Sequence, residues 1–184
     1  MTSSALKEEA TYTYEDYKHF PDELRCEIID GRIFDMTPAP SLKHQEVTGE
    51  IHRLIRNHLE ASSHPCRVYI APTDVVLAES QVVQPDVLVV CDGAKLKSAG
   101  VFGAPDVIFE VLSPGTEVKD RNEKMSLFER FAIPEYFLVH PEVEYVEKYV
   151  LVEGVYARPR FYRGDDAFVI DAIGLELTAK NLFA

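Results

Sequence analysis

The chain contains little cysteine and no long apolar segment. Only three cysteines occur among its 184 residues, namely Cys26, Cys66 and Cys91. Their number is odd and their spacing matches no metal-ligand motif, which is typical of free thiols in a reducing cytoplasm. No apolar run approaches the roughly 20 residues that span a membrane, and residues 1–10 lack the apolar core of a secretory signal. We therefore expect a cytoplasmic protein without a membrane segment.

Basic residues are also scarce. The chain has 19 lysines and arginines against 31 aspartates and glutamates, which gives a net charge of −12. Such a charge repels a polyanion and forgoes most of the counterion release that drives tight DNA binding. The arginine clusters Arg53/Arg56 and Arg158/Arg160/Arg163 could offset this repulsion locally. The composition therefore permits at most a weak or transient interaction with DNA.

Several common catalytic and cofactor motifs are absent. The sequence has neither a phosphate-cradling P-loop nor the Gly-x-Gly-x-x-Gly pattern of dinucleotide-binding folds. Ser113 lacks a convincing His/Asp relay and the flanking glycines of a nucleophile elbow. These absences argue against nucleotide-binding folds of either type and against serine hydrolysis.

What is present indicates one folded domain, which we expect to cover residues 13–184 after a flexible segment at 1–12. Hydrophobic residues make up 46% of the chain, enough for a substantial core. Val47, Ile51, Ile55 and Leu59 recur every four residues and predict a helix over about 43–61. The other predicted elements are helices at 14–20 and 120–132, strands at 26–29, 32–36, 67–77, 86–90, 106–112, 136–139, 143–152, 155–162 and 168–173, and loops at 37–40 and 91–104. This order predicts an α/β (α+β) domain with a central mixed sheet flanked by helices.

The most informative segment is residues 107–114, an almost wholly apolar strand with one carboxylate, Glu110. A buried, unpaired charge costs several kcal/mol, so Glu110 needs a partner. Two Pro-Asp-Val triplets offer Asp86 and Asp106. Asp106 lies four residues before Glu110 on one strand, about 13 Å away at ~3.3 Å per residue, which is too far for one shared ion. Antiparallel pairing would instead bring Asp86 beside Glu110, so we predict Asp86 as the partner and Asp106 as a turn or strand-end residue.

Two adjacent carboxylates predict either a shared proton or a bound cation. At about 4 Å they repel by roughly 4 kcal/mol at an effective dielectric of about 20. Magnesium commonly uses one or two carboxylates and fills its other positions with water and phosphate oxygens. We therefore predict Asp86 and Glu110 as catalytic ligands of Mg²⁺, with Mn²⁺ as a possible substitute.

Other polar residues could complete the site. Lys124 lies one turn into its predicted helix, where the macrodipole disfavours a cation, so we expect it to point at an anionic site. Asp120 is better explained as the N-cap of that helix, in an Asp120-x-x-Glu123 variant of the capping box, than as a ligand. Glu27 could add a third carboxylate, and His44 could contact phosphate or act as a base. For both of these, an ordinary structural or surface role stays open.

At these residues the chain resembles the Uma family of restriction endonucleases, within the PD-(D/E)xK nuclease superfamily. The matching blocks, in order, are residues 27–31, 36–40 with His44, 85–90, 103–114, Asp120-x-x-x-Lys124 and 134–136. The resemblance implies a restriction-endonuclease-like core and a magnesium-dependent nuclease site, with Asp86 and Glu110 as the metal-binding acids. The superfamily lysine would stand where this chain has Leu112, and a lysine on the next helix, Lys124, matches its replacement in the family.

Other departures from the family pattern affect the inferred substrate more than the site. They are Phe128 for tyrosine, Ala132 for glycine, Phe137 for tryptophan and His140 for an acid. Our first hypothesis is accordingly a Mg²⁺-dependent DNA endonuclease. The alternative is a catalytically silent interaction module of the same fold, and we expect a homodimer in either case. A third hypothesis, metal-independent acid/base hydrolysis, rests on the two carboxylates alone.

Overall fold

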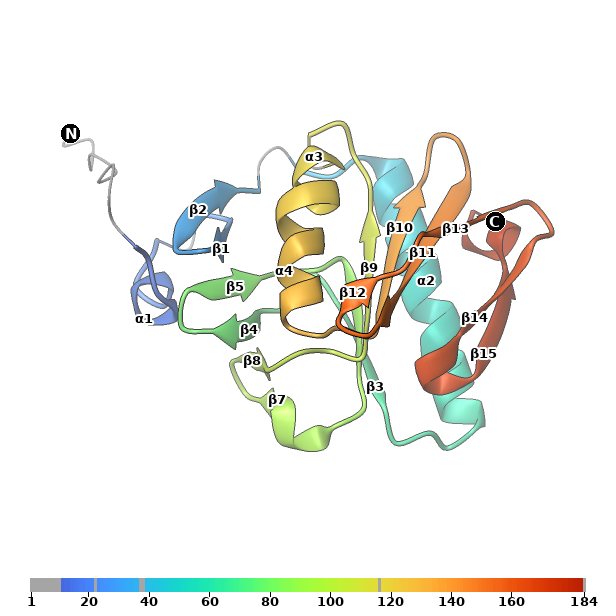
Figure 1. Cartoon of the computed structure of the whole chain (residues 1–184), viewed down its shortest axis with the longest axis horizontal. Helices are drawn as coiled ribbons and strands as arrows, with labels where there is room; N and C mark the ends of the chain where they lie inside the picture. Colours follow the sequence, from blue (N-terminus) through green and yellow to red (C-terminus); the bar gives the residue numbers. More distant parts are fainter. Residues whose placement is uncertain (1–10, 22, 37–38, 116, 184) are drawn as a thin grey trace.

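Two β-sheets meet near the middle of the molecule, and the larger one has a helix on each face (Figure 1). The computed structural model describes residues 11–21, 23–36, 39–115 and 117–183. Residues 1–10 of the predicted flexible segment, and Thr37 and Pro38 of the predicted loop, lie outside the described residues. In the described part of the chain no helix is long and apolar enough to cross a membrane.

The larger sheet is mixed, as predicted. Its strands follow the order β12 (Val155–Tyr156), β11 (Tyr145–Val152), β10 (Glu135–His140), β9 (Val107–Val111), β6 (Val87–Val90) and β3 (Arg67–Ile70), and β13 (Arg160–Arg163) also pairs with β11. Only β9 and β10 run parallel within this sheet, in the residues described. The predicted strand over 155–162 is wrong as a single element, because Pro159 between β12 and β13 has no N–H to offer a ladder.

The two faces of the larger sheet are covered by different helices. Helix α2 (Leu42–Ala61) confirms the predicted helix and packs its apolar stripe against residues such as Phe109 of β9. The neighbouring Ile108 points to the opposite face, where it packs with Leu127 and Phe128. That face is covered by the helical crossover from β9 to β10, which Figure 1 shows in front of the sheet. The α+β fold class is therefore as the sequence predicts.

The crossover is one continuous helical segment of three kinds. It consists of α3 (Glu117–Lys119), the π-helical segment η2 (Asp120–Lys124) and α4 (Met125–Arg130). The predicted N-cap at Asp120 is wrong, because Lys119 before it already has helical dihedral angles and no side chain caps the segment there. Asp120 instead lies inside the helix and is 2% exposed.

The smaller sheet was not predicted as a separate layer. Its strand order is β2 (Arg32–Asp35), β1 (Cys26–Ile29), β5 (Gln81–Val83), β4 (Val75–Ala78), β8 (Gly100–Phe102) and β7 (Leu96–Lys97). The hairpin of β1 and β2 is confirmed, whereas the predicted strand over 67–77 divides at Pro72 into β3 and β4, which belong to different sheets. The predicted loop over 91–104 contains β7, β8 and the 3₁₀ turn η1 (Gly93–Lys95). Helix α1 (Tyr14–Tyr17) is shorter than predicted.

The C-terminal residues form a hairpin over the α2 face of the larger sheet. It comprises β14 (Ala167–Ile170), η3 (Asp171–Ile173), β15 (Leu175–Thr178) and η4 (Ala179–Leu182). The strand predicted over 168–173 ends at Ile170, because the backbone N–H groups of Asp171 and Ala172 donate to the Glu135 carboxylate at 3.0 and 2.8 Å. Lys148 pairs with the same carboxylate at 2.8 Å and so fixes the hairpin to the sheet.

A disulfide joins Cys66 to Cys91, so the prediction of three free thiols is wrong. Cys66 directly precedes β3 and Cys91 directly follows β6, and Arg67 pairs with Val90 in the antiparallel ladder. The two cysteines are therefore cross-strand neighbours, although 25 residues separate them in sequence. Only the strand register reveals this pairing. Cys26 is a buried free thiol.

Candidate active site

Asp86 and Glu110 lie side by side on adjacent strands, as the sequence predicts. β6 and β9 are antiparallel with Val87 opposite Phe109, so the next pair along the ladder is Asp86 and Glu110. The Asp86 carboxylate accepts a hydrogen bond from the N–H of Val111 at 2.8 Å. The Glu110 carboxylate in turn accepts a long one from the N–H of Asp86 at 3.4 Å. Each acid is thus oriented by the backbone of the opposite strand.

Asp106 lies at the far end of the same ladder, as expected. Its carboxylate accepts a hydrogen bond from the N–H of Cys91 at 2.7 Å, and its own N–H donates to the carbonyl of Val89 at 2.8 Å. These bonds close the strand end beside the disulfide. Asp106 therefore has the structural role that distance along the strand predicted for it.

Lys124 joins carboxylates from both sheets. Its Nζ lies 2.7 Å from Glu110 Oε1 on the larger sheet and 2.9 Å from Glu27 Oε1 on the smaller one. Glu27 is fully buried in β1 and also accepts a hydrogen bond from the N–H of Gln84 at 2.9 Å. Lys124 is 2% exposed and Glu110 is 3% exposed. The structure therefore brings Glu27, Glu110 and Lys124 together, and Glu27 is part of the cluster rather than a surface residue.

Two further members of the cluster are Lys119 and Asp120, which the sequence did not single out as site residues. Lys119 Nζ lies 2.6 Å from Glu27 Oε2, and Asp120 Oδ1 lies 3.6 Å from Lys124 Nζ. At about 100° per residue, positions five apart on an α-helix face different ways, whereas an i→i+5 π-turn brings them closer to one side. The π-helical segment thus explains how Lys119 and Lys124 reach one carboxylate. No signal in the sequence predicts this π-helical segment.

Burial and neighbouring charges shift the pKa values of three groups in the cluster. Burial, reinforced by the surrounding carboxylates, raises the pKa of Glu110 well above its ordinary value even though Lys124 opposes the shift. Burial alone would lower the pKa of Lys124, but Glu110 and Glu27 raise it well above its usual range. Burial also works against ionisation of Glu27, yet Lys124 and Lys119 lower the pKa of its carboxyl. Lys124 is therefore held in its charged form, whereas the Glu110 carboxyl is biased towards its protonated form.

His44 reaches the other side of Asp86. It lies in the first turn of α2, where its N–H donates to the side chain of the N-cap Ser41 at 3.2 Å. Its Nε2 lies 3.2 Å from Asp86 Oδ2, and its Nδ1 lies 3.3 Å from the hydroxyl of Thr48. Burial lowers the pKa of His44, but the hydrogen bond and charge of Asp86 outweigh it and raise the pKa overall. The structure therefore brings all five predicted site residues into one connected cluster.

This cluster opens to the surface through a hollow of about 400 Å³. Asp86 and His44 line it together with Arg25, Pro72 and Ser113. Glu110 and Lys124 do not line the hollow. A molecule entering from solvent would therefore meet Asp86 and His44 first.

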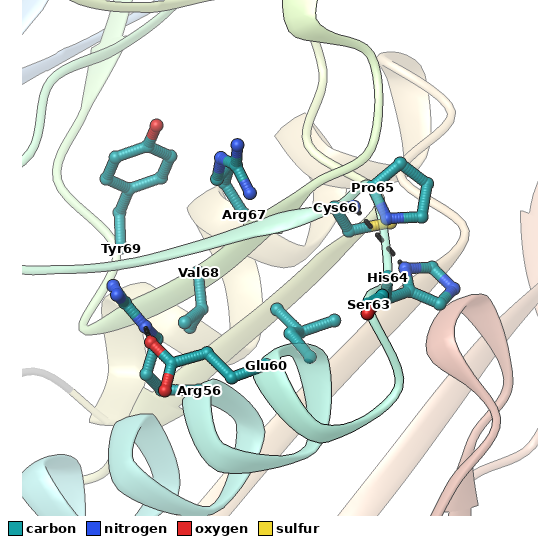
Figure 2. A pocket seen from close by; sticks show the side chains of 10 residues that line it. Arg56, Glu60, Ser63, His64, Pro65, Cys66, Arg67, Val68 and Tyr69 are labelled. Carbon is teal, nitrogen blue, oxygen red and sulfur yellow. Dashed lines mark hydrogen bonds and ion pairs between the residues drawn. The ribbon is translucent and has the colours of Figure 1, made fainter.

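A different hollow of about 700 Å³ lies beside the disulfide, between the end of α2 and β3 (Figure 2). Its basic residues are Arg56, His64 and Arg67, and Arg56 is paired with Glu60. None of the predicted site residues lines it. This hollow is therefore not the opening of the site cluster, which we call the acidic cluster and which consists of Glu27, Asp86, Glu110, Asp120, Lys119, Lys124 and His44.

The donor set can be compared with the needs of a magnesium ion. In the part of the chain that the structure describes, no three His, Cys, Asp or Glu side chains are arranged to hold a metal. Magnesium does not need three, because it commonly takes one or two carboxylates and completes its shell with water and phosphate oxygens. Asp86 and Glu110 are hard oxygen ligands on neighbouring positions of one ladder, and the cluster has more carboxylates than lysines. The residues present therefore suit such an ion.

The fold matches that of a solved protein. The chain superposes with a TM-score of 0.76 on a crystal structure described as "a putative nuclease belonging to DUF820" from Anabaena variabilis ATCC 29413. The match covers 93% of this chain and 97% of that one at 19% identity. At this identity the likeness concerns the fold alone.

Sequence comparison identifies relatives as well. The uncharacterized protein slr1290 of Synechocystis sp. (strain ATCC 27184 / PCC 6803 / Kazusa) is 31% identical over 117 residues, which cover 62% of this chain and 60% of that protein. The matched region thus spans about three fifths of the relative. Residues 12–180 match the family model described as "Uma2: Putative restriction endonuclease". That match includes every residue of the acidic cluster, and the chain belongs to the Uma2 family.

Proposed function

We propose that this protein is a Mg²⁺-dependent endonuclease that hydrolyses phosphodiester bonds of DNA at a PD-(D/E)xK-type site. One observation carries the proposal: Asp86 and Glu110 are adjacent across two strands, and a buried lysine holds Glu110 from behind. Membership of the Uma2 family supports it, because the description of that family names a nuclease activity. The proposed substrate phosphate enters the hollow lined by Asp86 and His44.

Asp86 and Glu110 would hold the magnesium ion, with manganese as a substitute. When bound, the ion supplies a water of lowered pKa and neutralises charge on the phosphate. It would also favour the ionised form of Glu110, which burial disfavours.

The remaining residues orient the acids and handle charge. Lys124 fixes Glu110 by one oxygen at 2.7 Å, which leaves the other directed towards Asp86. Glu27 holds Lys124 in place by an ion pair at 2.9 Å, and Lys119 in turn holds Glu27 by an ion pair at 2.6 Å. His44 keeps Asp86 oriented from the α2 side and is the group best placed to contact a phosphate oxygen or accept a proton.

A cleavage assay with matched variants tests the proposal. Wild type, Asp86→Asn and Glu110→Gln are incubated with plasmid and linear DNA in Mg²⁺ or Mn²⁺. Asp106→Asn is the control, because it comes from the second Pro-Asp-Val triplet and its amide oxygen can still accept from the N–H of Cys91. We expect both site variants to lose about 100-fold or more of the activity and the control to keep it. Cleavage that survives both site substitutions would exclude this site.

Metal binding can be tested without activity. A ligand that binds only the folded protein raises its melting temperature. We expect MgCl₂ to stabilise wild type more than NaCl at equal ionic strength, and this excess to disappear in Asp86→Asn. Equal effects of the two salts on wild type would contradict a magnesium site.

The alternative is a catalytically silent, homodimeric module with the same fold. The net charge of −12 favours it, because a polyanion is repelled by the protein as a whole. In that case no DNA is cleaved under any metal condition. Light scattering would still detect a dimer, which stays a prediction for either function.

A further inference from the structure

The hollow of the acidic cluster continues into a second one. Arg25 and Pro72 line both the 400 Å³ hollow, which contains Asp86, and a neighbouring hollow of about 560 Å³. The two hollows therefore adjoin at these residues. Arg25 directly precedes β1, the strand that carries Glu27, so its position is tied to the cluster. It is exposed and forms no ion pair with another described residue.

The second hollow has an aromatic wall. Tyr14, Tyr17 and Phe20 line it and are half-buried, with part of each ring accessible. The rings of Tyr14 and Tyr17 are stacked at 6.3 Å, and Tyr17 meets Phe20 edge-on at 6.0 Å. The hydroxyl of Tyr17 donates to Asp74 at 2.8 Å, which holds its ring in place. The wall is therefore preformed.

The path continues beyond the aromatic wall. A third hollow of about 400 Å³ shares Pro72, Asp74 and Gln84 with the second and is lined further along by Lys97. Asp74 lines both of these hollows, and its Oδ1 accepts hydrogen bonds from the hydroxyl of Tyr17 and the amide of Gln84, each at 2.8 Å. The order along the path is thus acidic cluster, arginine, aromatic wall and lysine.

This order fits one chemical class of ligand. Each hollow has the size of pockets that hold small organic molecules, so nucleotides can enter one at a time. Aromatic rings beside a cationic path are how proteins bind unpaired nucleic acid, because bases stack on the rings while phosphates meet the cations. In a duplex the bases are already stacked on one another and cannot use such a wall.

We propose that the path from Asp86 over Arg25 to Tyr14, Tyr17 and Lys97 binds an unpaired stretch of DNA next to the bond that is cut. The inference rests on the proposed function and specifies its substrate as single-stranded or locally melted DNA. Such a substrate is also compatible with the net charge of −12. A single strand depends less on counterion release than a duplex does, and stacking adds affinity that an acidic protein can use.

The test is a binding assay that needs no cleavage. Fluorescence anisotropy in EDTA compares three labelled probes with wild type: a single-stranded oligonucleotide, its duplex, and an abasic strand of equal length. The abasic strand keeps the phosphates but has no bases to stack. We expect the single strand to bind about tenfold more tightly than either of the others. Equal or tighter binding of the duplex, or equal binding of the abasic strand, would overturn the proposal.

Matched arginine variants place the binding on this path. Arg25→Ala should weaken single-strand binding about fivefold or more. Arg32→Ala is the control, because this arginine is also exposed but lines none of the three hollows of the path. It should change binding less than twofold. A larger loss in the control than in Arg25→Ala would contradict the path.

Cleavage is then measured separately, so the two proposals fail differently. Single-strand binding that depends on Arg25, with no cleavage in any metal, removes the endonuclease and keeps the path. Cleavage of duplex that depends on Asp86, with no effect of Arg25→Ala on binding or rate, removes the path and keeps the endonuclease.

Discussion

Lys124 is the residue on which the electrostatics of the cluster depend. It is buried, and its Nζ lies within 4 Å of Glu27, Glu110 and Asp120. Burying three carboxylates without a cation is costly, since desolvation alone amounts to several kcal/mol per ion. The lysine was predicted from its unfavourable place near a helix N-terminus. That reason does not hold, because the helix begins at Glu117 and Lys124 lies seven residues further along, beyond the first turn in which the macrodipole acts. The ion pairs with Glu110 and Glu27 account for its burial instead.

Removing the charge of Lys124 should therefore destabilise the fold. We expect Lys124→Met to lower the free energy of unfolding by about 3–5 kcal/mol at pH 7, measured with urea. The loss should shrink at lower pH, because the unpaired carboxylates then take up protons. The double variant Lys124→Met, Glu110→Gln should recover part of the stability. A single variant as stable as wild type would mean that the cluster is not charged as described.

The stability of the protein at acid pH also depends on Glu147, which lies in a second buried hydrogen-bond network. Hydrogen bonds from His140, Arg121 and Tyr149 outweigh the effect of burial and lower its pKa to about 2. A carboxyl whose pKa is lowered by folding stabilises the protein above its unfolded pKa, near 4.5, and loses this contribution as the pH falls towards 2.

Glu147→Gln tests that sign. At pH 6 the variant should be less stable than wild type by about 1–3 kcal/mol, and the two should converge as the pH falls from 4.5 towards 2. Urea unfolding at several pH values measures the difference. A difference that stays constant with pH would show that the loss is one of packing.

At the level of elements, the π-helical segment distinguishes this site from a regular helix. It lets Lys119 and Lys124 reach Glu27 together, although they are five residues apart. π-turns inside helices are frequent at functional sites. Asn122 lies within the segment and is exposed, so it can be removed without taking away a buried contact.

Deleting Asn122 should convert the π-turn to a regular α-turn, in which Lys119 and Lys124 are four residues apart and still face the same side. We therefore expect both lysines to keep their ion pairs with Glu27 and the free energy of unfolding to change by less than about 1 kcal/mol. The control Asn122→Ala keeps the segment's length and should change stability by less than about 0.5 kcal/mol. A loss of more than about 2 kcal/mol in the deletion alone would mean that the wide turn is needed to position the two lysines.

The disulfide joins the edge strand β3 to its neighbour β6. A loop of this length gives about 3 kcal/mol of stabilisation by restricting the unfolded chain. Reduction of wild type should therefore lower the unfolding free energy by about 2–4 kcal/mol. The control is Cys66→Ser, Cys91→Ser, on which the same reductant should have no effect. An equal response of both proteins would exclude the disulfide.

These elements also show how far the sequence can be read. Helix α2 and the β1–β2 hairpin could be predicted, because their signals lie within one short stretch of sequence. For α2 the signal is the regular spacing of apolar residues, and for the hairpin it is the residues of the turn. The pairing of Asp86 with Glu110 was predicted because it needs only the direction of two strands. The disulfide, the smaller sheet and the role of Asp120 were missed, because each depends on strand register or on a helical turn of unusual width. Prolines 72 and 159 were underweighted as breaks in the ladder.

For the molecule as a whole, the net charge of −12 sets a background of self-repulsion. Compact states of strongly charged chains are destabilised by it, and salt screens it over about 10 Å at 0.1 M. We expect the melting temperature to rise by about 2–5 °C between 20 and 200 mM of either NaCl or KCl. Near the isoelectric pH this rise should disappear. A salt effect that persists there would point to specific ion binding instead.

The carboxylates of the cluster come from both sheets, and this has a consequence for the order in which the protein folds. Glu27 comes from the smaller sheet and Glu110 from the larger, so Lys124 can hold both only after the sheets have docked. A chain in which only the larger sheet has formed therefore places Asp86 beside Glu110 but leaves Lys124 without Glu27. Under the proposed function, the site of a newly synthesised molecule would be complete only after the two sheets have docked, and local opening between the sheets would separate Glu27 from Lys124 again.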